Sequence, residues 1–293
     1  MYASFAYDLA RTEATKLVLL YTALFICAYF LKKSAGFNFS LLVIASILLR
    51  LIFLPAIPNL SQDFYRFIWD GRMLFEGFNP YLYMPDSFIQ NSEFPVNQAK
   101  ELYDGMGALS ASHFTNYPPI NQLCFYIAAL FSGKSITGAV VTLRLIIIAA
   151  DIGILYFGKK LLEALKLPSS RIWWYILNPF IIIELTGNLH FEGLMLFFFV
   201  MALYYIHTKK WHLAALTMAF SIAVKLVPIL SLPLFLTQLG WKKSIRFYLS
   251  IGAVFILLFL PFLSGDFYEN YSATIGLWFS KFEFNASFYY LFK

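Results

Sequence analysis

Runs of hydrophobic residues alternate with polar segments along most of the chain. The long runs cover residues 17–31, 39–57, 136–158, 172–186, 191–206, 212–239 and 245–263. Several are long enough to cross the hydrocarbon of a bilayer as an α-helix, which takes about 20 residues. The pattern predicts an all-α, polytopic integral membrane protein with one transmembrane domain over residues 1–293.

Residues 58–135 form the longest segment between two runs. Within it, "YPPINQLCFYIAALF" (117–131) fits either a short helix at the membrane surface or a further span. We take it as a surface helix, and 212–239 as two short helices broken near Pro228, because short connections rich in basic residues then share one side of the membrane. These residues are Lys32, Lys33, Lys159, Lys160, Lys166, Arg171, Lys209, Lys210, Lys242, Lys243 and Arg246. The positive-inside rule makes that side cytoplasmic and predicts that 58–135 is a large external loop.

Composition agrees with a membrane protein. Of the 293 residues, 60% are hydrophobic, 20% aromatic and 13% charged, and the mean hydropathy is +0.69. The net charge of +6 does not indicate a nucleic-acid partner, because the basic residues are scattered in short pairs. Cys27 and Cys124 lack the spacing of metal ligands.

The external loop begins with "LSQDFYRFIWDGRMLFEGFNPY", which has the period of a helix from Gln62 to Glu76. Asp63, Arg66 and Asp70 fall within an arc of about 60°. The apolar residues of another face, Phe64, Phe67, Ile68, Gly71 and Phe75, predict an amphipathic helix lying on the membrane. The charges fit two interpretations: pairs along the helix surface, or a site at the height of the lipid headgroups.

The site interpretation assigns each charge a chemical role. A carboxylate such as Asp63 can act as general base on an acceptor hydroxyl, and Arg66, Arg72 or Lys225 can bind a departing phosphate. Lys225 lies three residues before Pro228, which breaks the helix, and a cation beside a broken helix suits an anion. A lysine reaching to the interface explains its position equally well.

A second polar cluster, "ELTGNLHFEGLM", lies between two runs. Its Asn188, His190 and Glu192 suit sugar hydroxyls, and a hydrated turn with a capping role is the alternative.

Charged residues inside the runs allow a different function. Arg144 and Asp151 are two helical turns apart on one face, which suggests pairing with other helices, and Arg50 could pair with Glu184. A transporter or lipid flippase would use Arg144, Asp151, Glu184 and Lys225 as a pathway through the bundle.

In order along the chain, "SQDFYRFIWDGRMLFEGFNPY", "NYPP", "NPFIIIELTGNLHFEGL" and "VKLVPILSLP" resemble the GT-C glycosyltransferases, and in particular bacterial polyprenyl-phosphate-mannose-dependent mannosyltransferases of the GPI type. The resemblance implies a GT-C-like helical bundle, Asp63 as general base and Lys225 as a donor contact. In the family two acids are often adjacent in this loop. Here Gln62 precedes Asp63, and Asp70 could compensate. The family also has more spans, so this chain, which ends in "FEFNASFYYLFK", is expected to lack C-terminal helices.

The resemblance and the residues together predict an enzyme. It would move a sugar, most simply mannose, from a polyprenyl-phosphate donor to a hydroxyl of a lipid or glycan acceptor, with inversion. Arg66, Asp70, Arg72, Asn188, His190, Glu192 and Lys225 would bind substrate. We expect no cofactor and no metal, and we expect a bacterial inner-membrane protein whose active site faces the external, periplasmic side.

Overall fold

The computed structural model describes residues 1–34 and 38–280. All of the elements described there are helices. The last helix in the described residues is α15 (Phe267–Ser280), and the segment "FEFNASFYYLFK" (282–293), where the sequence suggested a further helix, lies outside the described residues.

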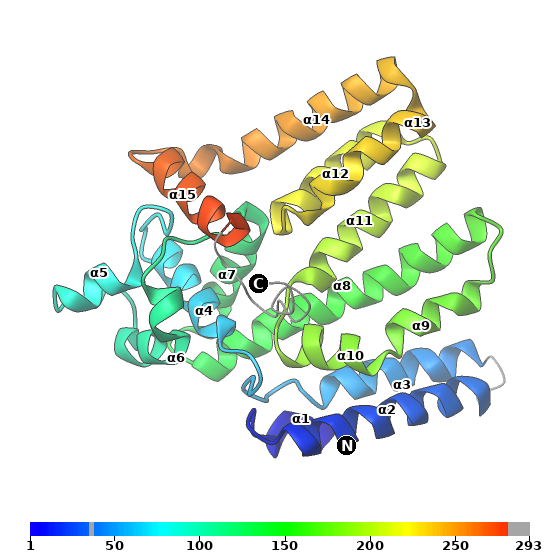
Figure 1. Cartoon of the computed structure of the whole chain (residues 1–293), viewed down its shortest axis with the longest axis horizontal. Coiled ribbons are helices and arrows are strands. Elements are labelled where there is room, and N and C mark those ends of the chain that lie inside the picture. Colours follow the sequence, from blue (N-terminus) through cyan, green and yellow to red (C-terminus); the bar gives the residue numbers. More distant parts are fainter. Residues whose placement is uncertain (35–37, 281–293) are drawn as a thin grey trace, which may run out of the picture.

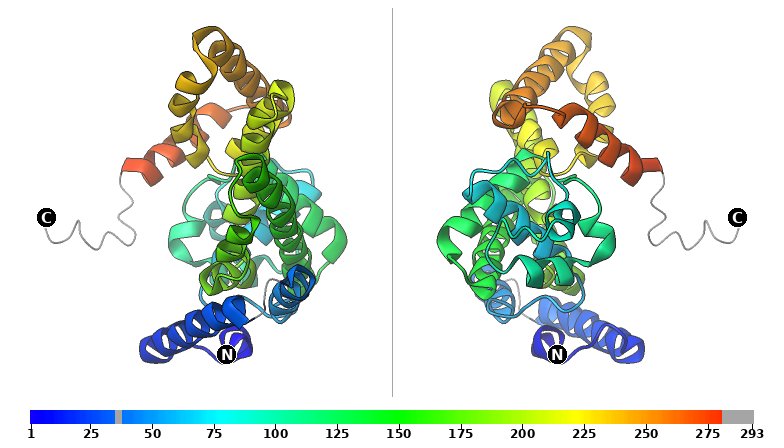
Figure 2. Two further views of the ribbon diagram at one scale, coloured as in Figure 1. Left: turned by 90° about the vertical axis from the view of Figure 1, so that its right-hand side faces the viewer. Right: turned by 90° about the vertical axis from the view of Figure 1, so that its left-hand side faces the viewer.

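Long apolar helices lie side by side and form a bundle, and shorter helices form a lobe at one end of it (Figure 1). From one edge of the bundle to the other, the main helices are α2 (Ala14–Ser34), α3 (Phe39–Leu51), α8 (Ile136–Ala164), α11 (Glu192–His207), α12 (Trp211–Val224) and α14 (Trp241–Phe259). The lobe contains α4 (Asp63–Phe75), α5 (Pro85–Gln90), α6 (Ala99–Ala111) and α7 (Pro119–Ser132). In Figure 2 the lobe lies between the two edges that α2 and α14 form.

Short elements complete the fold. They are α1 (Tyr2–Tyr7), η1 (Ser169–Ile172), α9 (Trp173–Ile176), α10 (Pro179–Ile181), the π-helix η2 (Ile182–Gly187), the 3₁₀-helix η3 (Val227–Leu234), α13 (Phe235–Leu239) and η4 (Leu260–Phe262). The run at 172–186 is thus not one helix. Asn178 is extended because a proline follows it, so the helix stops and restarts there.

Within the residues that the structure describes, three helical stretches are long and apolar enough to cross a membrane: Ala14–Lys33, Ile136–Ala164 and Trp241–Phe262. A fourth span is possible if Pro179–Gly187 and Glu192–His207, bent by 115°, count as one. With 14 residues α7 is about 21 Å long, too short to cross alone, in keeping with its prediction as a non-spanning helix.

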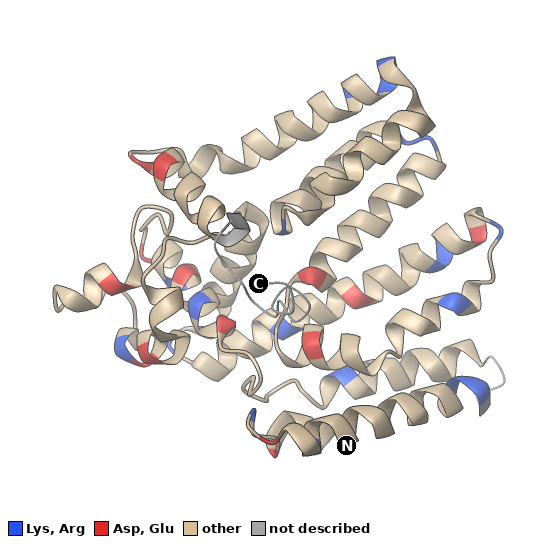
Figure 3. Ribbon diagram, viewed as in Figure 1, with Lys and Arg blue, Asp and Glu red and all other residues tan. Residues whose placement is uncertain are grey.

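The basic residues cluster at one end of the bundle. Figure 3 shows lysines and arginines at the ends of α2, α8 and α14 that lie away from the lobe, and in the connection from α11 to α12. The fold therefore brings together the short basic connections that the sequence grouped by charge, and it places the lobe at the opposite end.

The break predicted near Pro228 is confirmed. Pro228 has no N–H for the carbonyl of Val224, four residues earlier, and α12 ends at Val224. The freed carbonyl accepts a hydrogen bond of 2.8 Å from Asn121 Nδ2, and Lys225 follows in extended conformation (φ −151°, ψ 136°). The missing N–H of Pro228 thus leaves the Val224 carbonyl free to join the end of α12 to the first turn of α7.

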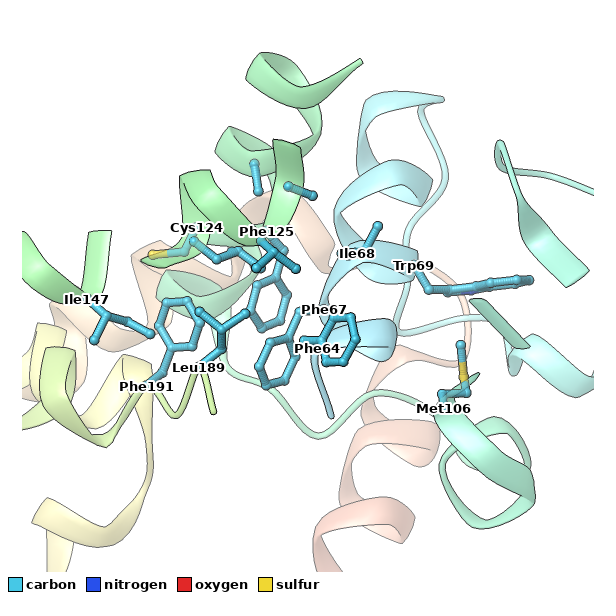
Figure 4. Packing of buried hydrophobic residues seen from close by; sticks show 14 of the residues in the cluster. Phe64, Phe67, Ile68, Trp69, Met106, Cys124, Phe125, Ile147, Leu189 and Phe191 are labelled. Carbon is cyan, nitrogen blue, oxygen red and sulfur yellow. The ribbon is translucent and has the colours of Figure 1, made fainter. Parts of the chain in front are cut away.

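Helix α4 lies in the core of the lobe. Nine of its 13 residues are buried against α6, α7 and neighbouring segments, including both Phe67 and Asp70. Its apolar face packs on protein, and not on the membrane as the amphipathic pattern suggested, because helices of the same loop cover it. Figure 4 shows the aromatic centre of this core, where Phe67 stacks on Phe125 of α7 at 4.6 Å and Phe191 packs against both rings edge to face.

Candidate active site

The structure brings four of the predicted site residues together at the junction of lobe and bundle. Asp63 is the first residue of α4, His190 lies in the turn before α11, Glu192 begins α11 and Lys225 follows α12. Lys225 Nζ forms an ion pair with Glu192, and both side chains are partly exposed. His190, Lys225 and Glu192 all act electrostatically on the Asp63 carboxylate.

Protein surrounding Asp63 changes its acidity. The side chain reaches solvent, yet partial desolvation raises the pKa of its carboxyl above the ordinary value. His190, when protonated, and Lys225 lower this pKa through their positive charge, and the negative charge of Glu192 raises it further. A carboxylate with a raised pKa binds a proton more strongly, which suits a general base.

A hydrogen-bonded network holds the polar turn that carries His190. Glu184 Oε1 accepts a bond of 2.7 Å from Tyr21 Oη of α2, and Oε2 accepts one of 2.9 Å from Asn188 Nδ2. His190 presents Nδ1 to the same carboxylate at 3.9 Å and Nε2 to Ser61 Oγ at 3.3 Å. The network therefore links the turn to the residues that precede α4.

The turn itself is strained. Leu189 has φ 60°, a left-handed conformation that a branched side chain adopts at a cost, and it is fully buried in the core of the lobe. Strained backbone of this kind, beside a π-helix, is common at functional sites.

Arg66, Asp70 and Arg72 lie inside the lobe, away from this cluster. Arg66 Nε binds Asp70 Oδ1 at 2.8 Å, and both side chains are at most 3% exposed. Their remaining bonds, and those of Arg72, go mainly to groups of the lobe: the Ser110, His113, Asn97 and Lys134 carbonyls and the Gln98 and Gln122 side chains. The hydrogen bonds and the ion pair of these three side chains thus hold the lobe together.

The charged residues inside the bundle have separate partners. Arg50 pairs with Asp151 at 2.7 Å, and not with Glu184 as the sequence suggested, because both oxygens of Glu184 bind Tyr21 of α2 and Asn188 of its own turn. Arg144 binds backbone carbonyls. In the described part of the chain, the bundle's buried charges thus have partners of their own: Arg50 pairs with Asp151, and Arg144 binds carbonyl oxygens.

Sequence reasoning missed Ser61 and Tyr21 and gave Glu184 no place in this site. Ser61 lies two residues before Asp63, which was a usable signal, but Tyr21 lies in an apolar helix 163 residues from Glu184. Among the described residues no group of three His, Cys, Asp or Glu side chains could hold a metal ion.

A mostly apolar groove of about 520 Å³, here called the α7 groove, lies between the lobe and the end of α14. Its walls include Leu74, Phe78, Ile120, Leu123, Leu258 and Phe262. The first turn of α7 forms one wall of the groove, and Asn121 in the same turn binds the carbonyl of Val224, the residue before Lys225.

Comparisons with known proteins point to one family. The family model described as "Alpha-(1->6)-mannopyranosyltransferase, N-terminal domain" matches residues 3–240. Alpha-(1->6)-mannopyranosyltransferase A of Corynebacterium glutamicum is 24% identical over 187 residues, 61% of this chain and 34% of the relative. The protein of the same name from Mycobacterium tuberculosis is 24% identical over 143 residues, 48% of this chain and 26% of the relative. The chain therefore spans about a third or less of these curated relatives, and no solved structure matches it.

Proposed function

This chain belongs to the alpha-(1->6)-mannopyranosyltransferase family, and we propose that it transfers mannose from a polyprenyl-phosphate donor to a hydroxyl of a lipid or glycan acceptor. The observation that supports this best is the cluster of Asp63, His190, Glu192 and Lys225, which places a base beside cations at the edge of an apolar bundle.

Asp63 is the base in the proposed reaction. Its carboxylate takes the proton of the acceptor hydroxyl while the acceptor oxygen attacks the anomeric carbon. The bond from that carbon to the phosphate oxygen breaks, and polyprenyl phosphate leaves with the electron pair. Attack opposite to the leaving group inverts the configuration, and the proton on Asp63 then passes to water.

Cations at the site bind the leaving phosphate. Lys225 is half-exposed and can turn from Glu192 toward a donor phosphate, and His190 lies on the same side of Asp63. Because the leaving group is a phosphate monoester, these side chains can supply the charge that a metal would otherwise provide. His190 and Glu192 are partly exposed and offer hydrogen bonds to sugar hydroxyls, whereas Asn188 is buried and donates to Glu184, so it supports the turn.

The α7 groove accepts the isoprenoid chain of the donor. It is lined mainly by apolar side chains, and two of its residues, Leu258 and Phe262, belong to the stretch Trp241–Phe262 that can span a membrane. A lipid chain lying there would place its phosphate toward the segment of Lys225.

The lobe lies on the external face of a bacterial inner membrane in this proposal. The basic end of the bundle, opposite the lobe, is then cytoplasmic, as the positive-inside rule requires (Figure 3).

The test is transfer from radiolabelled polyprenyl-phosphate mannose in membranes that contain the wild-type chain, its Asp63→Asn variant or neither. A general base predicts a loss of more than about 100-fold for Asp63→Asn. Asp104→Asn, at an exposed carboxylate of α6, is the matched control and should retain activity. Near-normal transfer by folded Asp63→Asn would exclude the base role. Absence of product from the wild-type chain with several donor sugars would favour the transporter alternative.

A further inference from the structure

Arg144 is a buried cation without a carboxylate partner. Its side chain is fully buried in α8, and in the described residues no Asp or Glu oxygen lies within 4 Å of it. Arg50, in contrast, is buried beside Asp151. A buried charge needs compensation, so the groups that Arg144 binds indicate its role.

The partners of Arg144 are three backbone carbonyls from two segments. Nε donates to Thr186 O at 2.8 Å and Nη2 to Gly187 O at 2.9 Å, while Nη1 donates to Leu54 O at 2.7 Å. Thr186 and Gly187 end the π-helix η2, where carbonyls lack helical partners and carry partial negative charge. The planar guanidinium can bind both segments at once, which a single ammonium cannot do.

Both segments lead directly into the candidate active site. Gly187 precedes Asn188 and His190, and Leu54 lies upstream of Ser61 and Asp63 in the connection from α3 to α4. The two segments touch near Arg144, since a Cβ on Gly187 would lie 3.0 Å from the ring of Phe53.

We propose that Arg144 is a positioning residue for the active site: it joins the turn that carries His190 to the segment that carries Asp63, and it acts only through those backbone carbonyls. The proposal concerns how the site is held, and its effect on catalysis rests on the proposed function. Without the hydrogen bonds of Arg144, the turn can move relative to Ser61 and Asp63. A displacement of about 1 Å lowers the rate of transfer by up to about 100-fold.

The test uses two variants, Arg144→Lys and Arg144→Met, with Arg50→Lys as a control at a second buried arginine. Mannosyl transfer is measured in each, alone and combined with His190→Ala. If Arg144 acts through the turn, Arg144→Lys reduces transfer by about 10- to 100-fold in the wild-type background and much less when His190 is already absent. Equal losses in both backgrounds would mean a general effect on folding and would overturn the proposal. Arg50→Lys should show no such dependence on His190.

A second readout does not need activity. Cysteines replace Ser61 and His190 in a chain in which Cys27 and Cys124 are serine, and a short bifunctional methanethiosulfonate reagent joins them. Arg144→Met should lower the cross-linking yield several-fold, and Arg50→Lys should leave it unchanged. An unchanged yield for Arg144→Met would refute the proposal. If no variant transfers mannose, the proposed function fails, and the cross-linking result still decides the role of Arg144.

Discussion

Replacing Gly71 by alanine should force α4 and α7 apart. A Cβ on Gly71 would lie 2.1 Å from the backbone oxygen of Phe125 and 2.5 Å from its carbonyl carbon. Both are backbone atoms within a helix, so no side-chain rotation relieves the overlap. To reach an ordinary contact of 3.4 Å, one helix must move by about 1.3 Å.

The cost follows from what this movement disturbs. The crossing at Gly71 holds the stacked pair of Phe67 and Phe125, with ring centroids 4.6 Å apart. Overpacking a core costs about 1–3 kcal/mol, and more where the backbone cannot adjust. We expect Gly71→Ala to lower the free energy of unfolding by about 3 kcal/mol. Because Asp63 begins the same helix, transfer activity should fall as well.

Thermal unfolding of the purified protein in detergent measures this effect. Gly252→Ala in α14 is the matched control, since a Cβ there meets no atom within 4 Å. In that helix alanine should be neutral or stabilise by about 0.5–1 kcal/mol. If Gly71→Ala unfolds at the temperature of the wild-type chain, the close approach of α4 and α7 is refuted.

Three further predictions concern charges. Glu192 raises the pKa of Asp63 and Lys225 lowers it. Glu192→Gln should therefore move the acidic limb of the pH-rate profile to lower pH, and Lys225→Met should move it to higher pH. Shifts of both variants in the same direction would contradict this. Asp63→Asn should raise the unfolding temperature at neutral pH, since a raised pKa means that the ionised carboxylate disfavours the folded state above that pKa. This gain should shrink as the pH falls toward the ordinary pKa of aspartate, and a gain independent of pH would be inconsistent with it. Asp151→Asn should lower the free energy of unfolding by about 3–5 kcal/mol, because it leaves the buried Arg50 without its counter-ion, and unchanged thermal unfolding would show that the pair is not needed.

The sequence predicted the helices well because their causes are local. Hydrophobic runs and helical periodicity gave α4 within one residue at each end, and a proline without an N–H gave the break after α12. The grouping of the basic connections came from counting charges, and the fold gathers them at one end of the bundle (Figure 3).

Part of the candidate site was also visible in the sequence. The sequence shows polar residues beside apolar runs at Asp63, His190, Glu192 and Lys225. A charged side chain there costs free energy unless it has a partner or a function. Helix α4 also shows the limit of this reasoning. Its pattern revealed an apolar face but not what would cover that face, and α6 and α7 cover it instead of lipid.

Only the tertiary structure decided which charged residues gather at the candidate site and which pair inside the protein. Arg66 and Asp70 look like Asp63 in the sequence, yet they are buried together inside the lobe. Arg50 binds Asp151 across 101 residues, and Arg144 binds carbonyls 42 and 90 residues away. A helical period fixes the face on which a side chain lies, whereas its partner depends on which helices pack beside that face, and in this chain those neighbours come from distant parts of the sequence.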